Sequence, residues 1–345
     1  MFGIIRKVDK AATKKETEEI PVAVEKPAKK PSEKLRRPKI GLALGSGVAR
    51  GWAHIGILRR LQEEGIEVDF IAGTSVGAVV GGAYAAGSLD ELEEWTRKLS
   101  EYSFFKFLDF KITGGGLFGG NSLNKLMKLK FGEKDFKELG IPFTAVACEL
   151  KTGHEVWLDT GKISDAIQAS FALPGVFEPV NRDKSWLVDG ALVNPVPVSV
   201  CRAAGCEMVI AVNLSEDLYG RVMKVRKGAK GTGEYGVFQE MVKDPAALGR
   251  GGSKSIFRKL FSHKGSAPSL FANMVASLSI LQNRLSRSRL AGDPPDVSIS
   301  PRCGHIGLME FHRAEELIEE GKIAFDENLS QLQDALEIIT HRMNS

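Results

Sequence analysis

The clearest chemical pattern in the chain is a serine between two glycines, in Gly73-Thr74-Ser75-Val76-Gly77. A G-x-S-x-G segment between a buried strand and a helix makes a tight turn that presents the serine hydroxyl outward. The glycines let the backbone turn without side-chain collisions, and the amide dipoles at the start of the helix point toward a developing anion. A structural loop is the alternative, because glycine and serine are common. In this setting the pattern predicts that Ser75 is a nucleophile.

A nucleophilic serine also needs hydrogen-bond donors for the oxyanion of its tetrahedral intermediate. We predict these donors in a glycine-containing loop after the first strand, Gly45-Ser46-Gly47-Val48-Ala49-Arg50-Gly51. Successive N–H groups of such a loop can converge on one oxygen, although the same loop could cradle a phosphate. A dinucleotide site is disfavoured, because Arg50 stands at the last glycine position of G-x-G-x-x-G and Asp69 precedes the serine turn.

The base that accepts the serine proton is not evident among the histidines. None of those after Ser75 lies in a convincing strand-end turn: His154, His263, His305, His312 and His341. Asp189 follows a short apolar strand, Trp186-Leu187-Val188, and precedes Gly190-Ala191. This exposed turn position suits a site residue, but taken alone it is better explained by an ordinary Asp-Gly β-turn.

The elements that must position these residues alternate between strand and helix. Apolar runs predict buried strands at 39–44, 68–72, 143–148 and 208–213. Helical spacing predicts a helix through Ile55, Leu58 and Leu61 that stops near Gly65, and further helices at 78–86, 273–290 and 311–325, the last extended by 329–339. This order is typical of an α/β domain with a largely parallel sheet covered by helices.

Composition places the chain among globular proteins. With 345 residues, 43% of them hydrophobic, it can bury a large core, and we predict one domain with appendages. The sequence has no run of eighteen apolar residues, so we do not expect a transmembrane helix. It also lacks the apolar stretch near Met1 that a secretory signal requires. Cys148, Cys201, Cys206 and Cys303 lack CxxC spacing and paired histidines. We therefore expect a cytoplasmic protein with reduced thiols and no metal or other cofactor.

Two segments differ from the rest in composition. Residues 1–38 are rich in Lys, Glu, Pro and Ala, and we predict a disordered tail. Residues 218–268 are rich in Gly, Lys and Arg and form a predicted basic insertion. The insertion either binds an anionic membrane surface, which would make the protein peripheral, or is a solvated loop. Nucleic acid is not an expected partner, because aromatic residues do not alternate regularly with the basic ones.

Taken together, the glycine-containing loop, G-x-S-x-G and Asp189-Gly190-Ala191 resemble the patatin-like phospholipases, in particular the bacterial branch related to neuropathy target esterase. Residues 169–177, 193–197 and 289–295 are also similar to that family. The resemblance implies a three-layer fold with a catalytic domain of residues 39–217 and 269–326 and a C-terminal helical extension of residues 327–345. It also implies a Ser75–Asp189 dyad without histidine, an oxyanion hole at residues 45–51, and a lipid or lysophospholipid substrate.

Within that resemblance, two residues of the loop need attention. Arg50 would stabilise the loop, although an arginine in the first turn of a helix is more often solvated. Val48 stands where the family usually has glycine, and a β-branched residue resists a positive φ angle. If the loop requires that angle, strain would lower activity, so a weak or silent lipid-binding protein is the alternative function.

Overall fold

The computed structural model describes residues 36–100, 109–110, 116–119, 125, 128, 133–216 and 270–345. The predicted insertion at 218–268 and nearly all of the predicted tail at 1–38 lie outside these ranges. None of the described helices combines the length and apolar character needed to cross a bilayer. Within the same ranges, no three His, Cys, Asp or Glu side chains form a group that could hold a metal ion.

An eight-stranded sheet forms the centre of the fold, with the order β11-β10-β1-β2-β5-β9-β8 and with β6 paired to β5. Its parallel strands are β1 (Ile40–Leu44), β2 (Phe70–Thr74), β5 (Phe143–Glu149), β10 (Met208–Val212) and β11 (Val297–Ile299). Antiparallel strands β6 (Glu155–Leu158), β8 (Val180–Arg182) and β9 (Ser185–Asp189) complete it. A separate small sheet contains β3 (Asp109–Phe110), β4 (Gly116–Gly119) and β7 (Gly175–Phe177).

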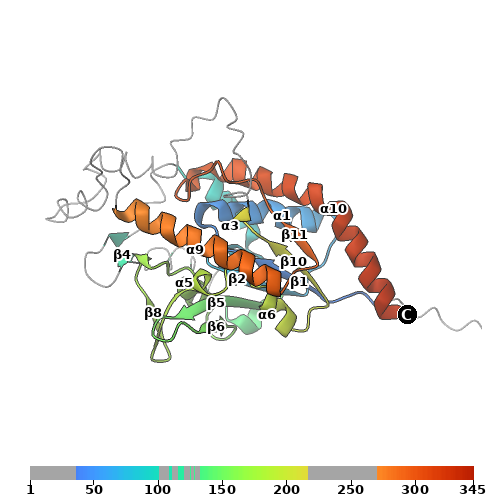
Figure 1. The fold of residues 1–345 in the computed structure, drawn as a ribbon, viewed down its shortest axis with the longest axis horizontal. Helices are drawn as coiled ribbons and strands as arrows, with labels where there is room; N and C mark the ends of the chain where they lie inside the picture. Colours follow the sequence, from blue (N-terminus) through green and yellow to red (C-terminus); the bar gives the residue numbers. More distant parts are fainter. Residues whose placement is uncertain are drawn as a thin grey trace, which may run out of the picture. The chain divides into compact units, whose positions relative to one another are not determined.

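Helices cover both faces of the large sheet (Figure 1). They are α1 (Ala53–Glu63), α2 (Val76–Ala85), α3 (Leu89–Arg97), α5 (Ile163–Ser170), α6 (Val198–Ala203), α9 (Leu270–Gly292) and α10 (Ala314–Asn344). Short 3-10 turns are η1 (Val48–Trp52), η3 (Phe136–Glu138), η4 (Gly190–Leu192) and η7 (Phe311–Arg313). Leu42 and Leu44 of β1 face the core shared with α1, α2 and α10, whereas Ala43 faces the core shared with α6. The alternation of a strand thus produces two cores and three layers.

The predicted α/β class and parallel sheet are confirmed, with some shifts in the elements. The strand predicted at 68–72 runs from Phe70 to Thr74, so it ends directly before Ser75. The helix predicted at 311–325 with an extension at 329–339 is present as α10, which begins at Ala314 after the turn η7 and continues to Asn344. The antiparallel strands β6 and β8 were not predicted, because both are short and neither carries a continuous apolar run.

Helices α1 and α10 lie side by side (Figure 1), and their backbones approach closely at two glycines. A Cβ atom on Gly56 would lie 1.9 Å from the Ile318 carbonyl oxygen, and one on Gly321 would lie 2.0 Å from the Ala53 carbonyl oxygen. Only glycine permits this approach of the two backbones. Since α1 directly follows the 45–51 loop, α10 supports the helix that anchors that loop.

Candidate active site

Ser75 occupies the sharp turn between β2 and α2. Its φ angle is 57° and its ψ angle is −123°, which is unusual for a residue with a side chain. Gly77 is required here, since a Cβ atom on it would lie 2.1 Å from the Leu44 carbonyl oxygen. Thr74 stabilises the turn, because its hydroxyl donates to the Asn194 carbonyl oxygen at 2.9 Å. The predicted turn is therefore present, but the serine side chain is buried rather than directed into solvent.

Ser170, the last residue of α5, holds the backbone of Ser75. The Ser75 N–H donates to Ser170 Oγ at 2.9 Å, and Ser170 Oγ donates to the Val146 carbonyl oxygen at 2.6 Å. This chain of hydrogen bonds joins the serine turn to α5 and β5. Ser170 belongs to the 169–177 segment noted above, but no sequence pattern assigned it a role.

Asp189 is the last residue of β9, and it lies beside Ser75. Its Oδ2 accepts a hydrogen bond from Ser75 Oγ at 2.6 Å, and its Oδ1 accepts one from the Ala191 N–H at 2.8 Å. The exposed position expected for Asp189 is wrong, because only 1% of the residue is exposed. The reason is that β9 pairs with β5 inside the sheet, with Asp189 opposite Ala147.

Burial sets the protonation behaviour of this carboxyl group. Loss of solvation raises the pKa of Asp189 from its ordinary value of 3.8 to about 7, against the opposing effect of hydrogen bonds from Ser75 and Ala191. Gly190 permits the tight packing, since a Cβ atom on it would lie 2.2 Å from the Val146 carbonyl oxygen. A carboxylate with a pKa near neutrality is a stronger base than an ordinary aspartate.

The 45–51 loop is fixed at both ends and leaves two N–H groups at its centre. Gly45 and Ser46 donate to the carbonyl oxygens of Val212 and Pro195, and Ala49 donates to that of Leu308. The N–H groups of Gly47 and Val48 make no hydrogen bond with any residue that the structure describes. Val48 has a φ angle of 52°, so the β-branched residue adopts the conformation that it resists.

Arg50 is buried, so the solvated side chain considered as an alternative is wrong. Its Nε donates to the Ile306 carbonyl oxygen at 2.7 Å, across 256 positions of the chain. The guanidinium thereby attaches the loop to the segment that precedes α10. Gly51 brings the loop against the serine turn, since a Cβ atom on it would lie 2.1 Å from Val76 Cγ2.

His54, in the first turn of α1, is a further residue that contacts the loop. Its Nε2 lies 2.8 Å from the Gly45 carbonyl oxygen, and the side chain is buried. Burial lowers the pKa of His54 to about 4, so the neutral imidazole donates its Nε2–H to Gly45 near neutral pH. His54 precedes Ser75 in the chain, whereas the histidine of a serine–acid–histidine triad in an α/β-hydrolase follows the serine. His54 was therefore not among the candidate bases.

An apolar pocket opens beside Ser75. Its lining residues come from the loop, from residues 171–177, from α9 and from the segment around η7: Val48, Ser75, Phe171, Leu173, Val176, Phe177, Val275, Met309 and Phe311. The free volume is about 20 Å³, which is room for roughly one water molecule. The pocket thus brings Val48 and Ser75 to one small apolar space.

Comparison with known proteins places the chain in a family. Residues 42–202 match the family model described as patatin-like phospholipase. An uncharacterised NTE family protein of Mycobacterium tuberculosis is 32% identical in an alignment of 326 positions that covers 83% of this chain and 89% of that protein. The neuropathy target esterase sws of Drosophila melanogaster is 31% identical over 182 residues, which are 51% of this chain and 13% of that protein.

Among solved structures, VipD from Legionella pneumophila aligns with 87% of this chain and 67% of its own, at 13% identity and a TM-score of 0.47. The family assignment depends on the sequence relatives instead. The residues that match the family model include the 45–51 loop, Ser75 and Asp189. The chain therefore belongs to the NTE family of patatin-like phospholipase proteins.

Proposed function

We propose that the chain is a serine hydrolase that cleaves acyl esters of membrane lipids, of the phospholipase A or lysophospholipase type. The observation that carries the proposal is the 2.6 Å hydrogen bond from Ser75 Oγ to the buried Asp189 carboxylate beside an apolar pocket. A hydroxyl paired with a base of raised pKa is equipped for nucleophilic attack. The apolar pocket favours an acyl chain over a polar substrate.

In the first half of the proposed reaction, Ser75 Oγ attacks the ester carbonyl carbon while Asp189 accepts the hydroxyl proton. The carbonyl oxygen becomes an oxyanion, and the N–H groups of Gly47 and Val48 are the donors available to stabilise it. The intermediate collapses as the carbon–oxygen bond to the alcohol breaks, and protonated Asp189 gives its proton to the departing alkoxide. The product is an acyl ester on Ser75.

In the second half, Asp189 accepts a proton from water, and the resulting hydroxide attacks the acyl carbon. The Ser75 oxygen leaves and recovers its proton from Asp189, which releases the fatty acid. Since one carboxyl group acts as base and then as acid in each half, a pKa near neutrality serves both directions of proton transfer.

A second candidate function is a lipid-binding protein whose chemistry is weak or silent. The observation that favours it is the positive φ angle of Val48, since strain in the oxyanion loop would impair stabilisation of the intermediate. The two candidate functions share a fold and a pocket, so a measurement of ester hydrolysis or of serine reactivity is needed to distinguish them.

A fluorophosphonate probe tests the proposal directly, because it labels an activated serine. We expect labelling of wild type and loss of labelling in Ser75→Ala and Asp189→Asn. Ser164→Ala is the matched control, because Ser164 is a buried serine on α5 that does not line the pocket. Hydrolysis of a lysophospholipid should fall at least ~100-fold in Asp189→Asn.

The pH profile gives an independent test of the base. Asp189 must be ionised to accept the proton, so kcat/KM should rise with pH through a single limb at about 7. Full labelling of Ser75→Ala would refute the nucleophile assignment. Absence of both labelling and fatty-acid release from wild type would support the silent candidate.

A further inference from the structure

Helix α9 has two chemically different faces. Its inner face supplies Val275 to the pocket and buries Asn283 and Ser286. Its outer face exposes two large apolar side chains, Ile280 at 46% and Leu281 at 64%. Figure 1 shows α9, in orange, crossing the near side of the large sheet. A helix that walls the pocket thus presents bare apolar side chains on its other side.

The charges of α9 are all positive. Residues 270–292 contain Arg284, Arg287 and Arg289 and no Asp or Glu. Arg289 is engaged at the inner side, where its Nη2 lies 3.0 Å from Glu155 Oε2 and its Nε donates to the Val193 carbonyl oxygen. Arg284 and Arg287 are exposed and form no ion pair within the described part of the chain. The outer face therefore combines exposed arginines with exposed apolar side chains.

Helical geometry places these four side chains together. Residues 280, 284 and 287 follow one another at spacings of four and three, and 281 adjoins 284 at a spacing of three. The contacts of Arg289 hold the C-terminal end of α9 against Val193, which follows the turn η4, and against Glu155 of β6. They thereby fix the rotation of α9 about its axis, so that its outer face points away from the sheet. An outer face of arginines around leucine and isoleucine is the composition of a helix that lies in a membrane interface.

We propose that the outer face of α9, formed by Ile280, Leu281, Arg284 and Arg287, docks the protein onto an anionic lipid surface. The arginines pair with headgroup phosphates, and the two aliphatic side chains enter the boundary between headgroups and acyl chains. This inference rests on the proposed function for the choice of a lipid surface. It deepens that function, because docking through α9 brings the membrane next to the wall of the acyl pocket.

A second copy of the chain is a weaker occupant of this face. A symmetric pairing would bring each set of arginines against its own equivalent, with no acidic residue on α9 to neutralise them. Anionic headgroups supply the missing negative charge. The charge of α9 therefore selects lipid over self-association.

The test measures sedimentation of the full chain with vesicles, in the Ser75→Ala background so that hydrolysis cannot alter the lipid. We expect binding to phosphatidylcholine vesicles that contain phosphatidylglycerol and little binding to phosphatidylcholine alone, with loss at high salt. Each of Arg284→Gln and Arg287→Gln should weaken binding about fivefold. The double variant Ile280→Ser/Leu281→Ser should weaken it at least ~10-fold.

The matched control is Ile338→Ser/Arg342→Gln on α10. Ile338 is 57% exposed, and Arg342 is an exposed cation on the same helix. We expect vesicle binding of this variant to equal wild type. Equal losses in the α9 and α10 variants, or no loss in the α9 variants, would overturn the docking face. Concentration-dependent dimers abolished by the α9 substitutions, without vesicle binding, would assign the face to a second copy instead.

Failure of the docking inference is distinguishable from failure of the proposed function. With Ser75 restored, the α9 variants should hydrolyse a soluble short-chain ester as wild type does, because none of the four residues lines the pocket. If wild type does not hydrolyse that ester, the proposed function fails whatever the vesicle result. If all variants hydrolyse it equally and vesicle binding is unchanged, only the docking inference fails.

Discussion

Two residues with side chains have positive φ angles in the pocket: Val48 at 52° and Ser75 at 57°. For Ser75 the angle follows from the turn that directs its hydroxyl to Asp189. Val48 lies between two parts of the 45–51 loop that are held by hydrogen bonds, at Ser46 and at Ala49, and these fix its φ angle. Such strained residues persist only where the surrounding structure determines them, and they are frequent at functional sites.

The strain at Val48 can be measured by comparing two substitutions. At an ordinary position alanine is more stable than glycine by ~0.5–1 kcal/mol, but a positive φ angle reverses this order. We expect Val48→Gly to exceed Val48→Ala in free energy of unfolding by about 1 kcal/mol. Urea denaturation of both variants gives the difference. Alanine more stable than glycine would show that the loop is not strained at this position.

At the residue scale, local patterns predicted the serine turn and the 45–51 loop, since each lies within a few consecutive residues. The role of Asp189 came from the resemblance to a family, because its local pattern alone favours an ordinary β-turn. Local patterns did not predict Ser170, His54 or the burial of Asp189. Ser170 is 95 positions from its partner Ser75, and the burial of Asp189 depends on the pairing of β9 with β5. These contacts exist only after the sheet has formed, so no spacing in the sequence reveals them.

At the scale of elements, the crossing of α1 and α10 depends on backbone contact. We expect Gly321→Ala to lower the free energy of unfolding by about 2–4 kcal/mol, because its methyl group would overlap the Ala53 carbonyl oxygen. Gly292→Ala is the matched control, since nothing lies within 4 Å of its Cβ position. Thermal denaturation compares them, and equal stability of the two variants would contradict the close packing.

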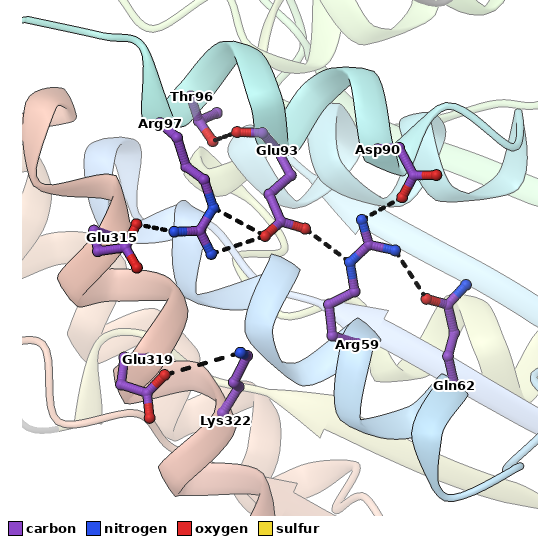
Figure 2. Close-up of polar contacts among 9 residues, drawn as sticks. All are labelled: Arg59, Gln62, Asp90, Glu93, Thr96, Arg97, Glu315, Glu319 and Lys322. Carbon is purple, nitrogen blue, oxygen red and sulfur yellow. Dashed lines mark hydrogen bonds and ion pairs between the residues drawn. The ribbon is translucent and has the colours of Figure 1, made fainter.

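Ion pairs join α3 to α1 and α10, as Figure 2 shows. Glu93 of α3 accepts hydrogen bonds from Arg59 of α1 and from Arg97, and Arg97 also pairs with Glu315 of α10. The same helix packs Trp95 edge-on against Trp52 of η1, with ring centroids 6.0 Å apart. The network therefore holds α3 in place against η1, the turn that contains the end of the 45–51 loop.

Removal of the charge on Glu93 should destabilise the protein at neutral pH. Burial alone would raise the pKa of Glu93, but hydrogen bonds from Arg59 and Arg97 outweigh it and lower the pKa. The stabilisation is thus present above the ordinary glutamate pKa and is lost as the pH falls. We expect Glu93→Gln to cost about 1 kcal/mol at pH ~7.

Glu94→Gln provides the comparison for Glu93→Gln. The Glu94 side chain is 63% exposed and pairs with exposed Lys98, whereas that of Glu93 is 16% exposed. An exposed pair contributes little, so we expect a change within ~0.5 kcal/mol. Chemical denaturation at low and high salt measures both variants. Equal losses of stability in the two variants would show that the Glu93 ion pairs contribute no more than an exposed pair does.

The element scale also shows where sequence prediction succeeds. The strands that became β5 and β10 are continuous apolar runs because parallel strands are covered on both faces. Strands β6 and β8 lie at the margins of the sheet, where one face meets solvent and the apolar signal is weak. Strands β5 and β10 are therefore predictable from their apolar runs, whereas β6 and β8 depend on tertiary pairing.

At the scale of the whole molecule, the proposed base sets a conflict between activity and stability. The pKa of Asp189 is about 7 in the folded protein and near its ordinary value of 3.8 in the unfolded chain. A raised pKa means that the folded state binds the proton more tightly than the unfolded state does. The associated stability is fully present below the ordinary pKa and is lost as the pH rises through 7. The proposed reaction requires the ionised form of Asp189, which the fold disfavours.

Asp189→Asn should therefore stabilise the protein at the pH values where the proposed reaction is expected to be fastest. Asparagine has the same shape, can accept from the Ala191 N–H and carries no charge to bury. We expect the difference in free energy of unfolding between Asp189→Asn and wild type to shift in favour of the variant by about 3 kcal/mol from pH ~5 to pH ~8. Urea denaturation of both proteins across this range isolates the contribution of Asp189, because every other titrating group is common to the two. A difference that does not change with pH would mean that the Asp189 carboxyl has an ordinary pKa in the folded protein, and the base proposed for Ser75 would lose its physical foundation.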